Sequence, residues 1–296
     1  MNIKQINWRP LQSNLLRMTT VTELLIEAEQ DMNCSSSARL DAELLLCDVM
    51  QFNRSKIYSH PDQLIAGEKL TLFKSLIEQR SQGYPVAHLI GKKEFWSLEL
   101  AINEDTLIPR PETELLVETA LKLVPDDAEY NILDLGTGSG AIAIAIASER
   151  PHSNLLATDI NTNALAIAKK NAAFHELTNI QFLVSDWYKN IPPQTFDLIV
   201  SNPPYIKQDD EHLSQGDVRF EPKLALVAGT DGMQAINIIL ELANIYLSSK
   251  AHLLIEHGYD QKELVRNSFL INGLKQIATV QDLSGQDRIT YGIKLN

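Results

Sequence analysis

Four consecutive residues, Asn202-Pro203-Pro204-Tyr205, have the types needed to hold a planar NH2 group. Two successive prolines are incompatible with a helix interior or a central strand, so the four form a rigid loop, and Pro204 keeps Pro203 extended. The side-chain oxygen of Asn202 and the carbonyl of Pro203 can each accept one hydrogen bond from the NH2 group. Tyr205 can pack against its plane. We expect Asn202 to Tyr205 to bind the substrate, with Asn202, Pro203 and Tyr205 catalytic.

Holding an NH2 group in this way solves a chemical problem. The nitrogen of an amide or aromatic amine is a poor nucleophile because its lone pair is delocalised. Two acceptors favour tetrahedral character at nitrogen and aim the lone pair at an electrophilic methyl group. Such an in-line displacement depends on proximity. We expect no obligatory general base, because the surplus proton can leave after transfer. A bland turn would not require Asn and Tyr beside two prolines.

A second chemical signal is the loop Gly136-Thr137-Gly138-Ser139-Gly140, which lies between a predicted strand and a predicted helix. Its glycines allow a tight turn and close approach of the backbone to a ligand, and the helix N-terminus presents free N–H groups. All five residues are predicted to bind a cofactor. With Ala141 the loop also fits the relaxed G-x-G-x-x-A dinucleotide pattern, so an NAD enzyme remains open. A tight turn without a ligand is the structural alternative.

Two further residues follow predicted strands and extend this cofactor site. Asp159 ends the next strand, where a carboxylate can accept both hydroxyls of a ribose; capping the helix at Thr162 is the alternative. Trp187 comes just after the third strand with Asp186 and could pack against an adenine, although a half-buried core Trp fits as well. These positions lie at the carboxyl ends of strands, where open α/β sheets bind ligands.

The elements that position these residues follow an α/β pattern from Pro111 onward. We expect helices at residues 112–123, 141–149, 162–174, 232–247 and 261–267, and strands at residues 131–135, 154–158, 180–184, 196–201, 251–256, 276–282 and 289–294. Strands alternating with helices predict a doubly wound, mostly parallel sheet. The connection at residues 283–288 is too short for a crossover helix, so the last strand is predicted to be antiparallel.

The chain before Pro111 has a different character. Apolar residues at helical spacing in residues 20–80, with Ser37 or Asp41 as a cap of the second helix, predict a small helical bundle. Residues 85–110 are predicted to form a linking β-hairpin with Lys92-Lys93 as its turn. We therefore expect a helical substrate-recognition domain at 1–84, a hairpin linker at 85–110 and a catalytic domain at 111–296.

Composition narrows the function classes. The formal net charge is −12, from 26 Lys plus Arg against 38 Asp plus Glu, which disfavours a protein that binds nucleic acid directly. Cys34 and Cys47 form no CxxC, and the histidines show no metal-ligand spacing. Residues 1–17 lack the apolar run of a secretory signal and are expected to be an extension or a misassigned start. We expect a cytoplasmic, monomeric protein with reduced thiols, no metal and no membrane contact.

Taken together, the motifs resemble those of class I methyltransferases, and more narrowly the peptide chain release factor glutamine methyltransferases of the PrmC/HemK family. Besides the two loops above, the resemblance rests on further segments of the chain: Leu107 to Glu114, Ile206, His212-Leu213, Gly216 to Pro222, Ile255 to Gly258 and Asp282 to Arg288. It extends over about residues 20–295.

The resemblance implies a function and a set of roles. The family transfers a methyl group from S-adenosyl-L-methionine to the side-chain amide of the glutamine in the Gly-Gly-Gln motif of release factors. Carried over, Gly136 to Gly140, Asp159, Trp187 and Asn202 would bind the cofactor, and Asn202 to Tyr205 would hold the glutamine amide. The N-terminal domain and the hairpin, with Phe95 and Trp96 as exposed candidates, would grip the release factor. Packing between the domains is the alternative for these two aromatic residues.

Arg110 and Glu112 have two alternative roles: they support the site, or they form a structural ion pair.

Four alternatives remain to be separated from this interpretation. A nucleic-acid amino methyltransferase could use the same tetrapeptide on a flipped base, but the net charge of −12 argues against it. A glutamine methyltransferase that acts on a ribosomal protein would differ from this interpretation in its substrate alone. Residues 216–222 resemble the release-factor enzymes more closely than those ribosomal-protein enzymes. An NAD-dependent oxidoreductase or a binding module without activity leaves Asn202 to Tyr205 unexplained.

Overall fold

The computed structural model describes residues 18–32, 35–127 and 129–295, and the chain divides into two compact units between Ile90 and Gly91. The expectations for residues 1–17 and for Cys34 lie outside the described residues. The β-hairpin that we expected to be a linker belongs to the second unit. Within the described residues, no helix combines the length and the apolar character needed to cross a membrane.

The first unit is a helical bundle, as the spacing of its apolar residues predicts. Its elements are β1 (Thr19–Thr20), α1 (Val21–Asp31), α2 (Ala38–Met50), α3 (Arg54–Ser59), β2 (Leu64–Ile65), α4 (Gly67–Ser81) and α5 (Val86–Ile90). A capping box begins α1, because Thr20 and Glu23 each accept a hydrogen bond from the other's backbone N–H. Leu25, Leu45 and Phe73 lie in one buried core that joins α1, α2 and α4.

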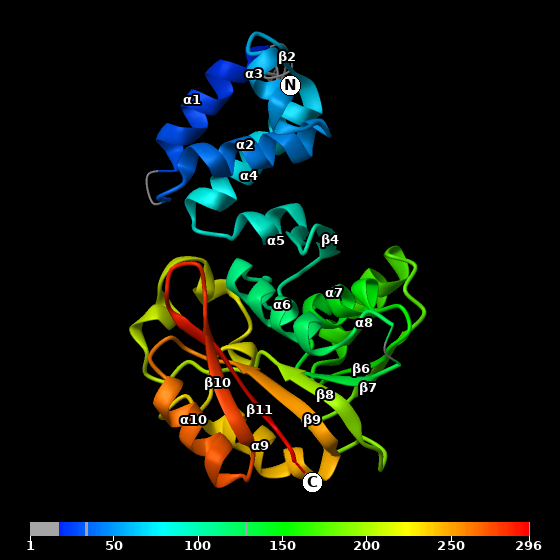
Figure 1. Ribbon diagram of the computed structural model, residues 1–296. Helices are drawn as coiled ribbons and strands as arrows, with labels where there is room; N and C mark the ends of the chain where they lie inside the picture. Colours follow the sequence, from blue (N-terminus) through cyan, green and yellow to red (C-terminus); the bar gives the residue numbers. More distant parts are fainter. Residues whose placement is uncertain (1–17, 33–34, 128, 296) are drawn as a thin grey trace, which may run out of the picture. The chain divides into compact units, whose positions relative to one another are not determined.

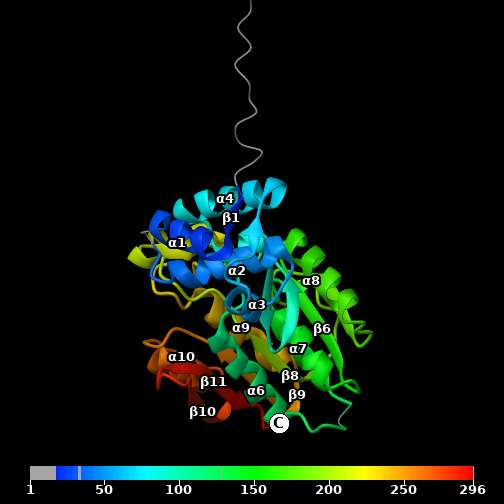
Figure 2. The same ribbon diagram turned by 90° about the horizontal axis from the view of Figure 1, so that it is seen from above.

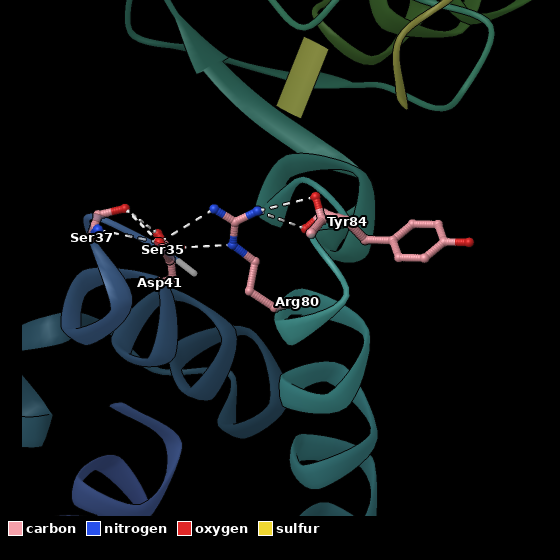
Figure 3. A network of polar contacts seen from close by, with 6 residues as sticks. Ser35, Ser37, Asp41, Arg80 and Tyr84 are labelled. Carbon is pink, nitrogen blue, oxygen red and sulfur yellow. Dashed lines mark hydrogen bonds and ion pairs between the residues drawn. The ribbon is translucent and has the colours of Figure 1, made fainter. Parts of the chain in front are cut away.

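A buried ion pair joins the start of α2 to the end of α4 in this unit (Figure 3). The guanidinium of Arg80 donates to Asp41 over 2.7 Å and also to the carbonyls of Gly83 and Tyr84. Asp41 in turn accepts from the hydroxyl groups of Ser35 and Ser37. Ser37 begins α2 without a side-chain cap on the backbone, because its hydroxyl is bonded to Asp41 instead.

Within the described residues, the second unit is built on a sheet of seven strands in the order β10-β11-β9-β8-β5-β6-β7. These strands are β5 (Asn131–Leu135), β6 (Asn154–Asp159), β7 (Ile180–Val184), β8 (Phe196–Ser201), β9 (Leu247–Glu256), β10 (Lys275–Gln281) and β11 (Asp287–Ile293). The strands β5 to β9 pair in parallel, and β11 lies antiparallel between β9 and β10. The predicted mostly parallel sheet with an antiparallel last strand is confirmed.

Helices cover both faces of this sheet (Figures 1 and 2). They are α6 (Glu114–Leu123), α7 (Ala141–Glu149), α8 (Thr162–Phe174), α9 (Gln234–Tyr246) and α10 (Lys262–Ile271). Alternate residues of β5 divide between the two layers: Ile132 packs with α6 and α7, and Leu133 packs with α9 and α10. The apolar residues of α7 are buried all round, as expected for a helix without a polar face.

The hairpin consists of β3 (Lys92–Phe95) and β4 (Leu98–Ala101). Our expectation of a turn at Lys92-Lys93 was wrong, because both residues lie in β3 and pair across to β4. The turn is Trp96-Ser97, whose φ angles of 52° and 58° give the left-handed backbone of a two-residue hairpin turn. Phe95 is not exposed, contrary to expectation; it is buried against the helices of the second unit. Trp96 is partly buried there and donates to Glu149.

The predicted boundaries differ most from the observed ones at β9, which begins at Leu247 rather than at residue 251, and at α10, which ends at Ile271 rather than at residue 267. Short helices account for further differences. Residues 111–113 form the 3-10 helix η1 (Pro111–Thr113), so α6 begins at Glu114 rather than at Glu112. Three more 3-10 helices occupy the segment after β8: η2 (Glu211–Ser214), η3 (Gly216–Phe220) and η4 (Lys223–Ala225). The helix α5 was not expected either.

Candidate active site

The glycine-rich loop connects β5 to α7 at the carboxyl edge of the sheet. The φ angles of Gly136, Gly138 and Gly140 are 73°, 56° and 87°, in the left-handed region that glycine tolerates best. The backbone N–H groups of Gly136 and Thr137 both donate to the carbonyl of Thr158, which fixes the loop to β6. A Cβ on Gly140 would lie 2.8 Å from Ile144 and 3.1 Å from Ala168, so this glycine allows α7 and α8 to pack closely.

Asp159 ends β6 and faces this loop. One carboxylate oxygen accepts from the backbone N–H of Gly138 over 2.8 Å, and the other accepts from the N–H of Asn161 over 2.8 Å. Burial raises the pKa of Asp159, while these two backbone hydrogen bonds oppose the increase. The cap of α8 is Asn161, whose side chain accepts from the N–H groups of Asn163 and Ala164. Asp159 is therefore not the helix cap that we considered as its alternative role.

A first cavity opens beside these residues, and we call it the donor cavity. It is lined by residues at the carboxyl ends of the four neighbouring strands β8, β5, β6 and β7, together with Ala164 of α8 and residues of the segments at 105–107 and 222–225: Asp105, Leu107, Gly136, Gly138, Asp159, Ile160, Asn161, Ala164, Ser185, Asp186, Trp187, Asn202, Pro204, Pro222, Leu224 and Ala225. Trp187 has a φ of 49°, and its ring lies 3.7 Å from where a Cβ of Gly136 would be. The cavity therefore has an indole on one side and the Asp159 carboxylate in its lining.

The tetrapeptide after β8 borders a second cavity, which we call the acceptor cavity. Its lining comes from this tetrapeptide, from η1 and the residues before it, from η3, from the end of η4, from the end of β9 and from the start of β11: Leu107, Arg110, Glu112, Asn202, Pro203, Tyr205, Ile206, Val218, Ala225, Leu226, Glu256 and Arg288. The side-chain NH2 of Asn202 donates to the hydroxyl of Thr113 over 3.1 Å. Because that NH2 group is bonded to Thr113, the Asn202 oxygen remains as its acceptor for a ligand.

The two cavities adjoin each other along Leu107, Asn202 and Ala225, which line both. Asn202 therefore borders both spaces, and its role toward cofactor and substrate stays a prediction. A group held in the acceptor cavity can meet a group held in the donor cavity without a large movement of the chain.

The segment before η1 is held in place by a partly buried ion pair. Arg110 donates to Glu221, whose side chain is fully buried, and the other Glu221 oxygen accepts from the N–H of Ile108 over 3.1 Å. Burial raises the pKa of Glu221, and the positive charge of Arg110 opposes the increase. The partner of Arg110 is thus Glu221 rather than the exposed Glu112. This contact connects the residues just before η1 with those just after η3, both of which line the cavities.

The far end of the tetrapeptide is fixed by contacts that sequence reasoning did not find. The side-chain NH2 of Gln261 donates to the carbonyl of Tyr205 over 3.0 Å and to the carbonyl of Gly232 over 3.3 Å. Gly232 has a φ of 75°, and a Cβ there would collide with the Tyr205 carbonyl oxygen. Burial raises the pKa of Tyr205, so its phenol is neutral at ordinary pH.

A second missed residue, Asn171 on α8, supports the glycine-rich loop from behind. Its buried side chain donates to the carbonyls of Ser139 and Ala101, and its oxygen accepts from the N–H of Ala101 over 2.8 Å. Three hydrogen bonds of one amide therefore join the loop to strand β4 of the hairpin. An Asn in the last turn of a helix gives no such signal in the sequence.

The predicted cofactor residues separate into two groups in the structure. Gly136, Gly138, Asp159, Trp187 and Asn202 line the donor cavity. The remaining loop residues, Thr137, Ser139 and Gly140, are buried behind it, and the Thr137 hydroxyl donates to Asp134 over 2.6 Å. Of the tetrapeptide, Pro204 lines the donor cavity, whereas Pro203 and Tyr205 line the acceptor cavity. Asp105, Glu221 and Arg288 were not predicted as lining or supporting residues in their own right.

This sheet order, with a glycine-rich loop at its carboxyl edge and two adjoining cavities, defines a class I methyltransferase. The comparisons with known proteins agree. Residues 111–218 match the family model described as the methyltransferase small domain, and residues 23–91 match the PrmC N-terminal domain. The solved structure of a methyltransferase from Pyrococcus furiosus has a TM-score of 0.53 and 16% sequence identity over 75% of this chain and 98% of that one, so it shares the fold.

Sequence similarity identifies the particular family. The release factor glutamine methyltransferase of Xylella fastidiosa (strain 9a5c) is 48% identical over 86% of this chain and 92% of that protein. The protein of the same name from Escherichia coli (strain K12) is 45% identical over 90% of this chain and 96% of that one. The chain belongs to the release factor glutamine methyltransferase family, and the resemblance that its motifs indicate is confirmed.

Proposed function

We propose that this enzyme transfers a methyl group from S-adenosyl-L-methionine to the side-chain nitrogen of the glutamine in the Gly-Gly-Gln motif of peptide chain release factors. The observation that carries the proposal is the position of Asn202, which lines both cavities and donates its own NH2 group to Thr113. Its side-chain oxygen then accepts from the substrate amide beside the methyl donor.

The residues of the donor cavity fit this cofactor. The Asp159 carboxylate can accept from ribose hydroxyls, the Trp187 ring can pack against the adenine, and the backbone of Gly136 and Gly138 allows close approach. When bound there, S-adenosylmethionine supplies an electrophilic methyl group. The remaining contribution of the protein is to hold the acceptor nitrogen in line and to exclude water.

The acceptor cavity supports an amide as the substrate group. The Asn202 oxygen and the Pro203 carbonyl accept the two N–H bonds of one planar NH2 group, and Tyr205 borders the same space. A ribosomal-protein glutamine or a nucleic-acid base presents the same NH2 group. Support for a release factor comes from the family to which the chain belongs and from the net charge of −12. The first unit serves in recognition of that partner, and the enzyme acts as a cytoplasmic monomer without a metal.

The substrate is tested by methyl transfer from labelled S-adenosylmethionine to a purified release factor, a ribosomal protein and DNA. We expect label only in the release factor, at the glutamine of the Gly-Gly-Gln motif, as located by mass spectrometry of the tryptic peptides. A release factor in which that glutamine is changed to asparagine serves as the matched substrate control. Label in DNA with the release factor unlabelled would exclude the proposed substrate.

The role of Asn202 is tested by Asn202→Ala. This variant loses both the acceptor for the substrate and the hydrogen bond to Thr113, so we expect kcat to fall by at least about 10²-fold, as for the loss of a polar group that acts in the transition state. The unfolding midpoint should stay close to that of the wild type. Asn267→Ala, at an exposed position of α10, is the control and should turn over normally. Wild-type kcat in Asn202→Ala would refute the role.

A further inference from the structure

Glu256 lies beside the acceptor motif because of the register of the sheet. Strands β8 and β9 are parallel neighbours in which Ser201 pairs with Ile255. The next residues along the two strands are Asn202 and Glu256, so they leave the sheet side by side at its carboxyl edge. On its other side Glu256 pairs with Ile289 of β11, which brings Arg288 to the same edge.

The carboxyl group of Glu256 is buried and incompletely bonded. The residue is 2% exposed and lines the acceptor cavity together with Asn202, Pro203 and Tyr205. Among the described residues, its Oε2 atom has no hydrogen-bond partner. A buried carboxyl oxygen without a partner has lost its hydrogen bonds to water and received none in return, which is unfavourable. Such an atom at a cavity wall therefore points to a ligand group that completes its bonding.

Two charges and two hydrogen-bonding side chains from neighbouring segments act on Glu256. Burial raises the pKa of Glu256 to about 7. Hydrogen bonds from Thr113 and Asn202 and the positive charge of Arg288 oppose this increase. The negative charge of Glu112 adds to it. The nearby Arg110 is already paired with Glu221, and Tyr205 is a neutral phenol. Both the ionised and the protonated form of Glu256 are thus accessible near neutral pH.

We infer that Glu256 is a further catalytic residue of the acceptor cavity, which accepts the proton that the substrate nitrogen gives up on methylation. The inference rests on the proposed function, since it requires an NH2 group in this cavity. It also changes our expectation from the sequence, in which no residue was needed for this proton.

The proton balance is simple. The nitrogen lone pair would form the new N–C bond while the bond between the methyl carbon and the sulfur of the cofactor breaks, with its electron pair left on sulfur. The nitrogen would then carry the positive charge. One N–H bond then breaks, its electron pair returns to nitrogen, and the proton binds to an oxygen of the Glu256 carboxylate. The neutral carboxylic acid later passes the proton to water when the product leaves. Glu256 must be ionised before the step, so the rate should increase with pH through the pKa of this group.

The main test is the isosteric variant Glu256→Gln, which keeps the shape but cannot take up a proton. We expect the rate constant of methyl transfer in single-turnover experiments, and kcat with it, to fall by about 10²-fold or more. The steady-state KM for both substrates should stay within threefold of the wild type. The increase of kcat with pH near 7 should disappear. Glu118→Gln, at an exposed position of α6, is the matched control and should retain the wild-type profile. A Glu256→Gln variant with wild-type kcat at every pH would overturn the inference.

A second variant tests the electrostatics without touching the carboxyl group itself. Because the charge of Glu112 raises the pKa of Glu256, Glu112→Gln should move the increase of kcat to lower pH. An unchanged midpoint in this variant would contradict the assignment of the pH dependence to Glu256.

A third measurement does not use activity. The carbon-13 signal of the Glu256 carboxyl group, assigned by its loss in Glu256→Gln, should titrate near pH 7 and respond to a peptide containing Gly-Gly-Gln. A signal that neither titrates in this range nor responds to the peptide would also overturn the inference. If the wild type does not methylate the release factor, the proposed function fails separately, and the variants are then compared on the substrate that the wild type does methylate.

Discussion

At the scale of single residues, the acceptor loop depends on positions that carry no chemistry of their own. Gln261 donates to the carbonyl of Tyr205, Gly232 leaves room for that carbonyl, and Thr113 orients the amide of Asn202. Sequence reasoning found Asn202 to Tyr205 because two prolines beside Asn and Tyr are unusual. It could not find Gly232 or Glu256, because their contact with this loop depends on the register of distant strands rather than on spacing along the chain.

Gly232→Ala tests how rigidly the loop must be held. An Ala at a φ of 75° is strained, and its Cβ would collide with the Tyr205 carbonyl and lie 2.7 Å from the Gln261 side chain. We expect an unfolding free energy lower by about 1–3 kcal/mol and kcat reduced at least tenfold. The control is Gly67→Ala, which has a similar φ of 62° but no atom within 4 Å. If both variants lost the same stability and neither lost activity, steric support of the loop would be excluded.

At the scale of elements, the sequence predicts the alternating strands and helices of the second unit with small errors at their ends. Buried parallel strands form continuous apolar runs, which are easily recognised. The misplaced hairpin turn has a physical cause: Trp96-Ser97 adopts left-handed backbone angles with residues that rarely do so. The supporting contacts of Asn171 and Glu221 were also out of reach, since each joins segments distant in the sequence.

The Arg80–Asp41 pair is the contact that should be tested at this scale (Figure 3). Arg80→Met leaves Asp41 buried with the two serine hydroxyls as its remaining side-chain donors among the described residues, and it removes the donor to the carbonyls of Gly83 and Tyr84. We expect the first unit to lose about 3–5 kcal/mol of stability in chemical denaturation. The double variant Arg80→Met with Asp41→Leu should recover part of the loss, because no unpaired charge stays buried. Additive losses would show that the pair is not coupled.

At the scale of the whole molecule, the protein is strongly acidic, and its catalytic unit also buries one carboxyl group at the glycine-rich loop and one in the wall of the acceptor cavity. Burial raises the pKa of Asp134 and of Glu256 to about 7 in each case. A carboxyl whose pKa is raised on folding stabilises the fold most below its unfolded pKa of about 4. That contribution is lost as the pH rises toward 7. These two buried carboxyl groups therefore lower the free energy of unfolding near neutral pH.

This pH dependence can be measured with Asp134→Asn. The wild-type unfolding free energy should decrease between about pH 4 and pH 7 relative to the variant, by up to about 1.4 kcal/mol per pH unit. The measurement is denaturant unfolding at a series of pH values, with Asp127→Asn at an exposed position as the control. Parallel pH profiles of the wild type and Asp134→Asn would contradict the raised pKa of Asp134.

The side chain of Asn171 has one more consequence, for the way in which the catalytic unit opens. Its amide group is bonded at the same time to Ser139 of the loop and to both backbone groups of Ala101 in the hairpin. The hairpin and the loop therefore cannot detach independently, since either event breaks bonds of the same group. Their backbone hydrogens should exchange with solvent as one cooperative unit. A ligand that binds to the loop should then also slow hydrogen exchange in the hairpin, even though the ligand does not contact the hairpin.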